Sequence, residues 1–262
     1  MRKGNGSFIN LERAGAIAIV TINNPPLNIL TDEVLTELDL ALDDIVNFLD
    51  CRGIIVKALG EKAFAAGADI QQFPSLTKSS GMELVEKGKK IFDRLSVSEM
   101  PVICAINGLA LGAGLELALA CDIRIAEENA RLGLPETGLG ILPGYGGTQR
   151  LARLIGPGKA KEIIFTGETL SAKEAFEIGL VERVVPVGES ITYAKFMAGK
   201  IAEKGPLAIS NAKKAVDYGL DMNLSSAQAL ETELFSNLCE TRDMKEGIQA
   251  FMEKRKPVFI GE

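Results

Sequence analysis

Short apolar runs alternate with longer amphipathic stretches over the first half of the chain. Residues 8–13 and 16–22 flank the turn signal Ala14-Gly15 and predict a β-hairpin, because their apolar positions alternate or run together. Compact apolar runs of five or six residues predict buried strands. They occupy residues 53–58, 101–106 and 122–126.

Helical spacing marks the segments between these strands. In residues 31–50, an apolar side chain recurs every three or four positions after Thr31, a favoured N-cap residue. These positions are Val34, Leu35, Leu38, Leu42, Ile45, Val46 and Leu49. Residues 82–95 and 113–121 predict two further helices. Strands that alternate with helices indicate an α/β fold with a parallel sheet and crossover helices.

The pattern changes near residue 188, where the strand signals stop. The remaining chain predicts helices at residues 191–203, 206–218, 224–241 and 244–254. We therefore expect an α/β core that carries the active site over residues 1–200 and a helical region for oligomerisation over residues 201–262.

Charge and composition narrow the class of partner. The chain has 29 basic and 35 acidic residues, a net charge of −6, which argues against a nucleic-acid partner. The first residues are basic but no apolar signal segment follows, and no apolar run is long enough to span a membrane. A cytoplasmic protein without a membrane partner is expected. Of four scattered cysteines, three lie in apolar or helical stretches, which fits small core positions better than metal ligands.

The sequence contains no histidine. Ser-His-Asp and Cys-His nucleophilic centres are therefore excluded, as are metal sites built on histidine, and no metal is expected. Any acid/base chemistry must use carboxylates, lysines, tyrosines or cysteines.

Three glycine-rich stretches interrupt the strand and helix pattern, at residues 62–70, 107–116 and 134–150. The first two follow predicted strands, where ligands of α/β proteins bind. None has the spacing of a P-loop or a dinucleotide fingerprint. Taken singly, each is more often an ordinary turn.

Glu116 stands out because the helix around it, GAGLELALAC, is otherwise apolar or small. Such a helix is normally buried, and a buried carboxylate is costly unless it is paired or used. The alternative is a carboxylate that stabilises a helix N-terminus. Glu136, twenty positions later, would alone be an ordinary loop carboxylate. Together, the two glutamates and the backbone donors at strand ends could form one site. Water addition to an unsaturated thioester needs these parts: a base for water, an acid for the α-carbon and donors for the enolate oxygen.

Five segments match motifs of a known family. They are KAFAAGADI, AINGLALGAGLELALACD, LGLPETGLGILPGYGGTQRL, TGETLSAKEAFEIGLVERVV and FMEKRKPVF. In this order they resemble the crotonase superfamily and, within it, the enoyl-CoA hydratases. The resemblance covers nearly the whole chain and is weakest over residues 190–236.

The resemblance implies a fold and a reaction. The fold is an α/β, ClpP-like spiral of ββα units with a helical C-terminal trimerisation region, in trimers that usually pair as hexamers. The backbone N–H groups of Ala68 and Ala113 would form the oxyanion hole. Glu116 would activate water and Glu136 would exchange a proton with the α-carbon. Alanine replaces the commoner glycine at position 113, where only the backbone is used.

The resemblance also implies an acyl-CoA site, with CoA as part of the substrate and no separate cofactor. Its contacts would be Pro26, Leu27, Ala66, Asp69, Ile70, Gln71 and Gly112, with Phe251 and Lys254 from a neighbouring subunit. Gln71 stands where relatives often have lysine. Lys254-Arg255-Lys256, as a bare charge run, is more often a solvated face.

Several alternatives stay open on the sequence. Tyr145, where relatives often have a small residue, would reshape the acyl pocket or else pack or face solvent. The same scaffold supports enoyl-CoA isomerisation and hydration of branched substrates such as methylglutaconyl-CoA, although two glutamates favour hydration. Some relatives bind RNA, so a non-catalytic RNA- or acyl-CoA-binding protein is the rival from another class.

Overall fold

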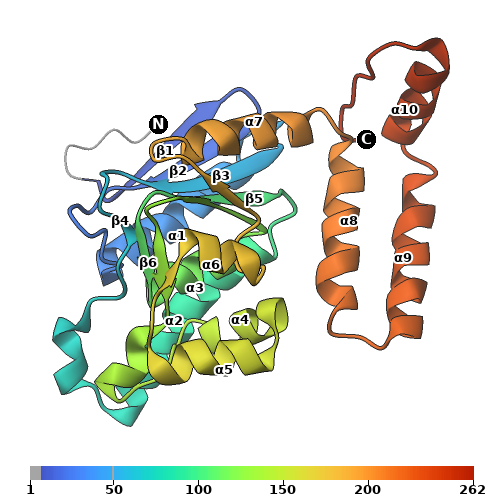
Figure 1. Cartoon of the computed structure of the whole chain (residues 1–262). Helices are drawn as coiled ribbons and strands as arrows, with labels where there is room; N and C mark the ends of the chain where they lie inside the picture. Colours follow the sequence, from blue (N-terminus) through green and yellow to red (C-terminus); the bar gives the residue numbers. More distant parts are fainter. Residues whose placement is uncertain (1–6, 49) are drawn as a thin grey trace.

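The computed structural model of the chain describes residues 7–48 and 50–262 (Figure 1). Leu49, the last apolar position of the predicted first helix, lies outside the described residues, as does the basic start of the chain over residues 1–6. Within the described residues, none of the helices is long and apolar enough to cross a membrane.

A six-stranded sheet holds the strands that the sequence predicted. Its order is β1 (Ile9–Ala14), β2 (Ile17–Ile22), β3 (Gly53–Ala58), β5 (Val102–Ile106), β7 (Ile123–Glu127) and β10 (Arg183–Val185). The β1–β2 hairpin is antiparallel and the other pairs are parallel, as expected.

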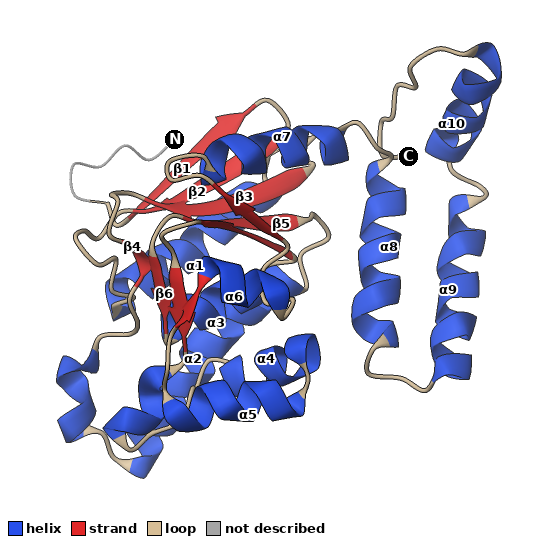
Figure 2. Ribbon diagram, viewed as in Figure 1, coloured by secondary structure: helices blue, strands red, loops and turns tan. Residues whose placement is uncertain are grey.

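A second sheet of very short strands stands beside the first (Figure 2). Its order is β4 (Ala63–Ala65), β6 (Leu109–Leu111), β8 (Arg131–Gly133) and β9 (Leu170–Ser171). The chain thus repeats a unit of long strand, short strand and helix. Each turn of the spiral adds one strand to both sheets, and the expected spiral of ββα units is confirmed.

The helices of the core follow the strands in the same order. They are α1 (Asp32–Val46), α2 (Lys78–Ser96), α3 (Ala113–Leu119), α4 (Gly147–Ile155), α5 (Pro157–Thr166), α6 (Ala172–Glu177) and α7 (Ser190–Ala202), with 3-10 turns η1 (Ile70–Ser75) and η2 (Pro135–Leu139). Thr31 caps α1 by accepting the N–H of Val34, as predicted. The helix ends four residues before the predicted position 50, because Asn47 caps it and Asp50 adopts a left-handed conformation.

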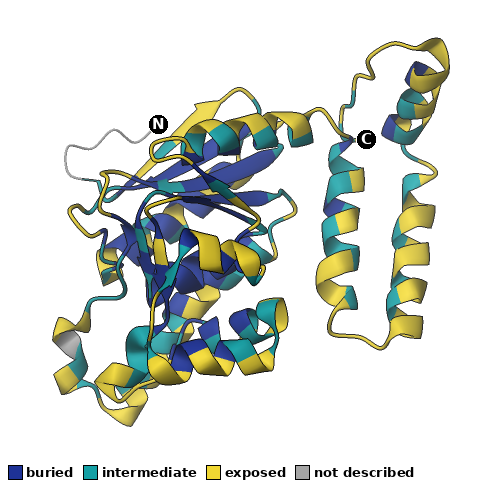
Figure 3. Ribbon diagram, in the orientation of Figure 1, coloured by how far each residue is buried: buried dark blue, intermediate teal, exposed yellow. Residues whose placement is uncertain are grey.

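Two apolar layers cover the two faces of the larger sheet, and buried residues fill the centre of the molecule (Figure 3). The larger layer packs α1, α2, α3 and the small sheet against one face. On the other face, Ala194 and Ala198 of α7 pack on Ile19, Ile55 and Ile103.

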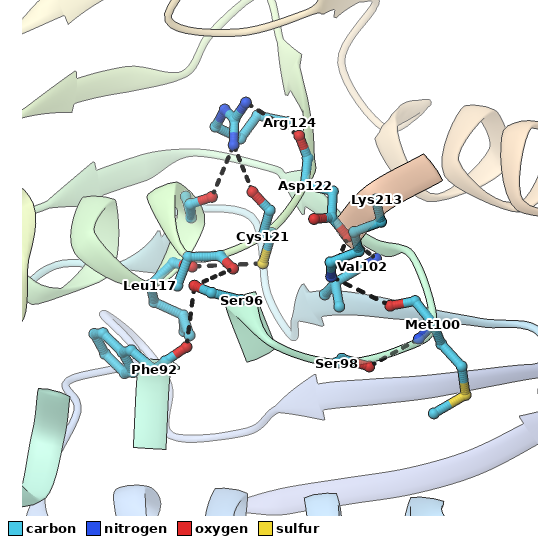
Figure 4. Close-up of polar contacts among 12 residues, drawn as sticks. Phe92, Ser96, Ser98, Met100, Val102, Leu117, Cys121, Asp122, Arg124 and Lys213 are labelled. Atoms are coloured by element: carbon cyan, nitrogen blue, oxygen red, sulfur yellow. Dashed lines mark hydrogen bonds and ion pairs between the residues drawn. The ribbon is translucent and has the colours of Figure 1, made fainter. Parts of the chain in front are cut away.

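The last three helices stand apart from this core (Figure 1). They are α8 (Pro206–Gly219), α9 (Leu224–Leu238) and α10 (Arg242–Glu253). Asp122 Oδ2 connects them to the sheet, since it accepts the N–H of Val102 at 2.7 Å and Lys213 Nζ at 2.9 Å (Figure 4). The division into regions at residue 200 stays a prediction, although the last core helix ends near it.

Candidate active site

The ends of three short strands place the expected site residues side by side. Ala68 follows β4, Ala113 follows β6 and Glu136 follows β8. Because β4, β6 and β8 are neighbouring parallel strands, these three segments leave the same edge of the small sheet. A hydrogen bond from Gly112 N to Gly133 O, 3.0 Å long, continues the pairing beyond the strands. The spiral therefore brings together residues that are up to 68 positions apart, from Ala68 to Glu136.

A cavity of about 670 Å³ opens at this edge. Of the expected residues, it is lined by Ala66, Ala68, Ile70, Gly112, Ala113, Glu116 and Glu136. The rest of the lining is almost wholly apolar, and includes Leu84 and Val85 from α2 and Leu139 and Leu142 from the segment after β8. The two glutamates are its only charged lining residues among those described. An apolar cavity with a few convergent polar groups is typical of a small-molecule site.

Glu116 is buried at one side of this cavity. Its side chain projects from the first turn of α3, and the residue is 2% exposed. Oε1 accepts the N–H of Tyr145 at 2.8 Å and the N–H of Gly147 at 2.7 Å. Among the described residues, none donates to Oε2. One carboxylate oxygen is thus fixed in position and the other is left for chemistry.

Burial raises the pKa of Glu116 to about 7, and the two backbone donors offset only part of that effect. The charge of Glu136 raises the pKa of Glu116 further, so the two carboxylates interact electrostatically. A carboxyl group with a pKa near neutrality exchanges protons readily at physiological pH. Groups perturbed in this way inside a cavity are candidates for catalysis.

Glu136 enters the cavity from η2. Its Oε2 is buried without a hydrogen-bond partner among the described residues. A Cβ on Gly112 would lie 2.9 Å from Glu136 Oε1, so the absence of a side chain at Gly112 leaves room for this carboxylate. Burial also raises the pKa of Glu136. A buried carboxylate oxygen without a hydrogen-bond partner is costly unless a ligand uses it.

Two residues that line the same cavity have backbone N–H groups available to a ligand. Ala68 and Ala113 both line it, and each follows a glycine with positive φ, at +114° for Gly67 and +52° for Gly112. Over residues 7–48 and 50–262, neither N–H donates a hydrogen bond within the protein. The N–H of Ala113 is free because it is the first of α3, which has no intrahelical acceptor. Unpaired donors beside a cavity are available to an oxygen of a ligand.

Asn28 supports this arrangement and was not identified from the sequence. The residue is fully buried; its Nδ2 donates to the carbonyls of Leu59 and Ala63, and its Oδ1 accepts the N–H of Asn24. These bonds fix the segment before α1 against β4. Its left-handed backbone, with φ +51°, favours asparagine, but the letters alone do not show which carbonyls it reaches.

Arg150 is a second residue that sequence analysis missed. Its guanidinium donates to the carbonyl of Tyr145 at 2.9 Å and pairs with Asp93 of α2 at 2.5 Å. The arginine therefore fixes the loop whose N–H groups hold Glu116.

The remaining expected CoA contacts divide into two groups. Leu27 lies beside the cavity, since its carbonyl accepts the N–H of Ala66, and Asp69 caps η1 by accepting the N–H of Gln71. Pro26 joins this segment through a cis peptide bond. Phe251 instead lies in α10 and Lys254 caps that helix, which stands apart from the α/β core (Figure 1). Their contribution from a neighbouring subunit stays a prediction.

Comparisons with known proteins agree with this geometry. The model of the family Enoyl-CoA hydratase/isomerase matches residues 12–262. The Short-chain-enoyl-CoA hydratase of Clostridium acetobutylicum is 46% identical over 247 residues, covering 94% of this chain and 95% of the relative. The Crotonyl-CoA hydratase of Syntrophomonas wolfei is 42% identical over 255 residues, covering 97% and 98%. The crystal structure of an enoyl-CoA hydratase from Bacillus anthracis superposes with a TM-score of 0.93 at 43% identity, covering 97% and 100% of the two chains. This chain belongs to the enoyl-CoA hydratase/isomerase family, as its motifs predicted.

Proposed function

We propose that this protein is an enoyl-CoA hydratase, a hydro-lyase that adds water reversibly to the double bond of a trans-2-enoyl-CoA to give a 3-hydroxyacyl-CoA. The observation that carries the proposal is the pair Glu116 and Glu136, two carboxylates with raised pKa values lining one apolar cavity beside two unpaired backbone donors. The family match and the hydratase relatives confirm the enzyme class that the sequence predicted.

In this proposal, the thioester carbonyl oxygen accepts the N–H groups of Ala68 and Ala113. Negative charge that develops on this oxygen in the transition state is then stabilised by donors already in place. Because these donors have no partner among the described residues, the substrate displaces no hydrogen bond that the structure records there.

Each of the two glutamates carries out one proton transfer. Water forms a bond from its oxygen to the β-carbon and gives a proton to Oε2 of Glu116, since Oε1 is held by backbone donors. Glu136 gives a proton to the α-carbon as the double bond is lost, and both additions occur on one face. The reaction needs Glu116 ionised and Glu136 protonated. Burial of both carboxylates disfavours their ionisation, and the charge of Glu136 disfavours that of Glu116 further, so a state with one proton on the pair is favoured over double ionisation.

A panel of enoyl-CoA thioesters of different length and branching tests this assignment. Hydration removes the conjugated double bond, so ultraviolet absorbance falls, and a 3-hydroxyacyl-CoA is formed that chromatography identifies. If only branched thioesters such as methylglutaconyl-CoA were turned over, the protein would be a hydratase of branched substrates. Migration of the double bond without water uptake would indicate an isomerase. No turnover of any thioester, with salt-sensitive RNA retention, would favour the non-catalytic alternative.

The proposal includes an assembly. Many apolar side chains of the C-terminal region are exposed in the single chain: Val216, Leu220, Leu224, Phe235, Ile248, Phe251, Met252, Val258 and Ile260. Exposed apolar patches of this kind mark protein interfaces. We expect a homotrimer or a pair of trimers, in which Phe251 and Lys254 reach the CoA of a neighbouring subunit. The substrate is an acyl-CoA, no cofactor or metal takes part, no nucleic acid is bound, and a cytoplasmic location is expected.

A further inference from the structure

One face of α2 runs from the cavity into the core. Gly81, Leu84 and Val85 of this helix line the cavity. Continuing at helical spacing, the same face presents Gly88 and then Phe92, both of them buried. The cavity therefore ends, along this helix, between Val85 and Gly88.

The ring of Tyr145 occupies the space at this end. It meets the ring of Phe92 edge to face, with centroids 5.5 Å apart. A Cβ on Gly88 would lie 2.5 Å from Tyr145 Cε1, so the ring fits only because residue 88 has no side chain. Tyr145 is 5% exposed and also lines the cavity, which excludes a solvent-facing position. The ring is thus a fixed end wall.

This wall lies close to the reacting atoms. The N–H of Tyr145 donates to Glu116 Oε1, the side chain that serves the β-carbon in the proposed reaction. The ring of Tyr145 therefore limits any acyl chain that extends from Glu116 along α2. Arg150 holds the Tyr145 carbonyl and Phe92 holds the ring, so movement of the wall would disturb the core.

We propose that Tyr145 closes the acyl end of the cavity and makes the enzyme selective for short enoyl chains. Gly88 provides the space in which the ring is seated. The inference rests on the proposed function and goes beyond it, because it names the residue that sets chain length. Neither a larger hydrophobic residue at position 88 nor a small one at position 145 is compatible with this wall.

Chain-length series test the proposal directly. The ratio of kcat/KM for a trans-2-enoyl-CoA of about eight carbons to that for crotonyl-CoA is measured in wild type, Tyr145→Ala, Tyr145→Leu and Tyr145→Phe. One methylene in a hydrophobic pocket changes selectivity by roughly tenfold or more. We expect Tyr145→Ala to raise the ratio by at least about tenfold and Tyr145→Leu by less. Tyr145→Phe keeps the ring, so its ratio should match wild type.

An unchanged ratio in both Tyr145→Ala and Tyr145→Leu would overturn the proposal, as would a shift of equal size in Tyr145→Phe. Each ratio is internal to one variant, so general loss of activity does not affect it. Tyr145→Leu keeps the test informative if Tyr145→Ala fails to fold. Failure of the proposed function is distinguishable, because wild type would then hydrate no enoyl-CoA of any length.

A second measurement tests the packing of the Tyr145 ring against Gly88. Gly88→Ala should lower the thermal midpoint of wild type, because the new methyl group collides with Tyr145. In the Tyr145→Ala background, the same change should raise the midpoint, since alanine favours a helix over glycine. A change of the same sign in both backgrounds would contradict the packing on which the wall depends.

Discussion

Glu116 and Gly147 are in contact in two ways. Glu116 Oε1 accepts the N–H of Gly147 at 2.7 Å, and a Cβ on Gly147 would lie 2.9 Å from that same oxygen. The glycine therefore both holds the carboxylate and leaves room for it. Gly147 begins α4, so the position of the proposed base depends on where this helix starts.

Gly147→Ala should lower kcat for crotonyl-CoA hydration by about 10²-fold, because displacement of a catalytic group by about 1 Å costs that much. Steady-state kinetics with the conjugated-band assay gives the value. Gly158→Ala in α5 is the matched control, since a Cβ there would have no atom of the described residues within 4 Å beyond its own helix backbone. Equal kinetics in the two variants would show that the Gly147 contact does not position Glu116.

The sequence predicted the first five strands of the larger sheet and seven of the helices, because their apolar periodicity is decided locally, but it did not predict α4, α5, α6 or β10. Glu116 was found for a related reason, as a carboxylate in an apolar helix. The short strands β4, β6 and β8 have three residues each, too few for any period. Asn28 and Arg150 could not be predicted, since each acts through backbone carbonyls that only the folded chain brings near. The roles of Ala68, Ala113 and Glu136 came from the resemblance.

Removal of either carboxylate should affect chemistry more than binding. We expect Glu116→Gln and Glu136→Gln each to reduce kcat by at least about 10²-fold, the usual contribution of a positioned acid or base. Binding of a saturated acyl-CoA, measured by calorimetry, should change little because the amide keeps the shape. A near-native rate in either variant would remove that residue from the mechanism.

The raised pKa of Glu116 makes the stability of the folded protein depend on pH in a direction that can be worked out. The folded pKa is about 7, above the ordinary value of 4.5. Below the ordinary value, the group is protonated in both states and has no effect. As pH rises to about 7, ionisation favours the unfolded chain, so stability falls by about 3 kcal/mol and then levels. Because hydration needs Glu116 ionised and Glu136 protonated, its rate should rise as Glu116 ionises and fall once Glu136 has lost its proton.

Glu116→Gln cannot ionise, so its free energy of unfolding should exceed that of wild type increasingly between about pH 5 and about pH 7. Denaturant titrations at several pH values measure this difference. A difference that does not vary with pH would mean that the Glu116 pKa is not raised.

The contact between Asp122 and Lys213 predicts how α8 is held to the core. Lys213 has a side-chain exposure of 9% and Asp122 one of 24%, and Nζ lies 2.9 Å from Oδ2 (Figure 4). Burial raises the pKa of Asp122 and the charge of Lys213 opposes this effect. Lys213→Met leaves a carboxylate without its cation, and loss of one partner of a buried pair costs about 3 kcal/mol or more. Unfolding by urea should reveal this loss at about pH 7.

Protonation of Asp122 removes the charge that Lys213 neutralises. The destabilisation by Lys213→Met should therefore be largest above the pKa of Asp122 and should shrink as pH falls towards about 4. Lys214→Met is the adjacent control: its pair with Glu99 is largely exposed, at 33% and 74%, and such pairs contribute at most about 1 kcal/mol. If the two lysine variants lose equal stability at every pH, α8 is held by its apolar contacts rather than by Asp122.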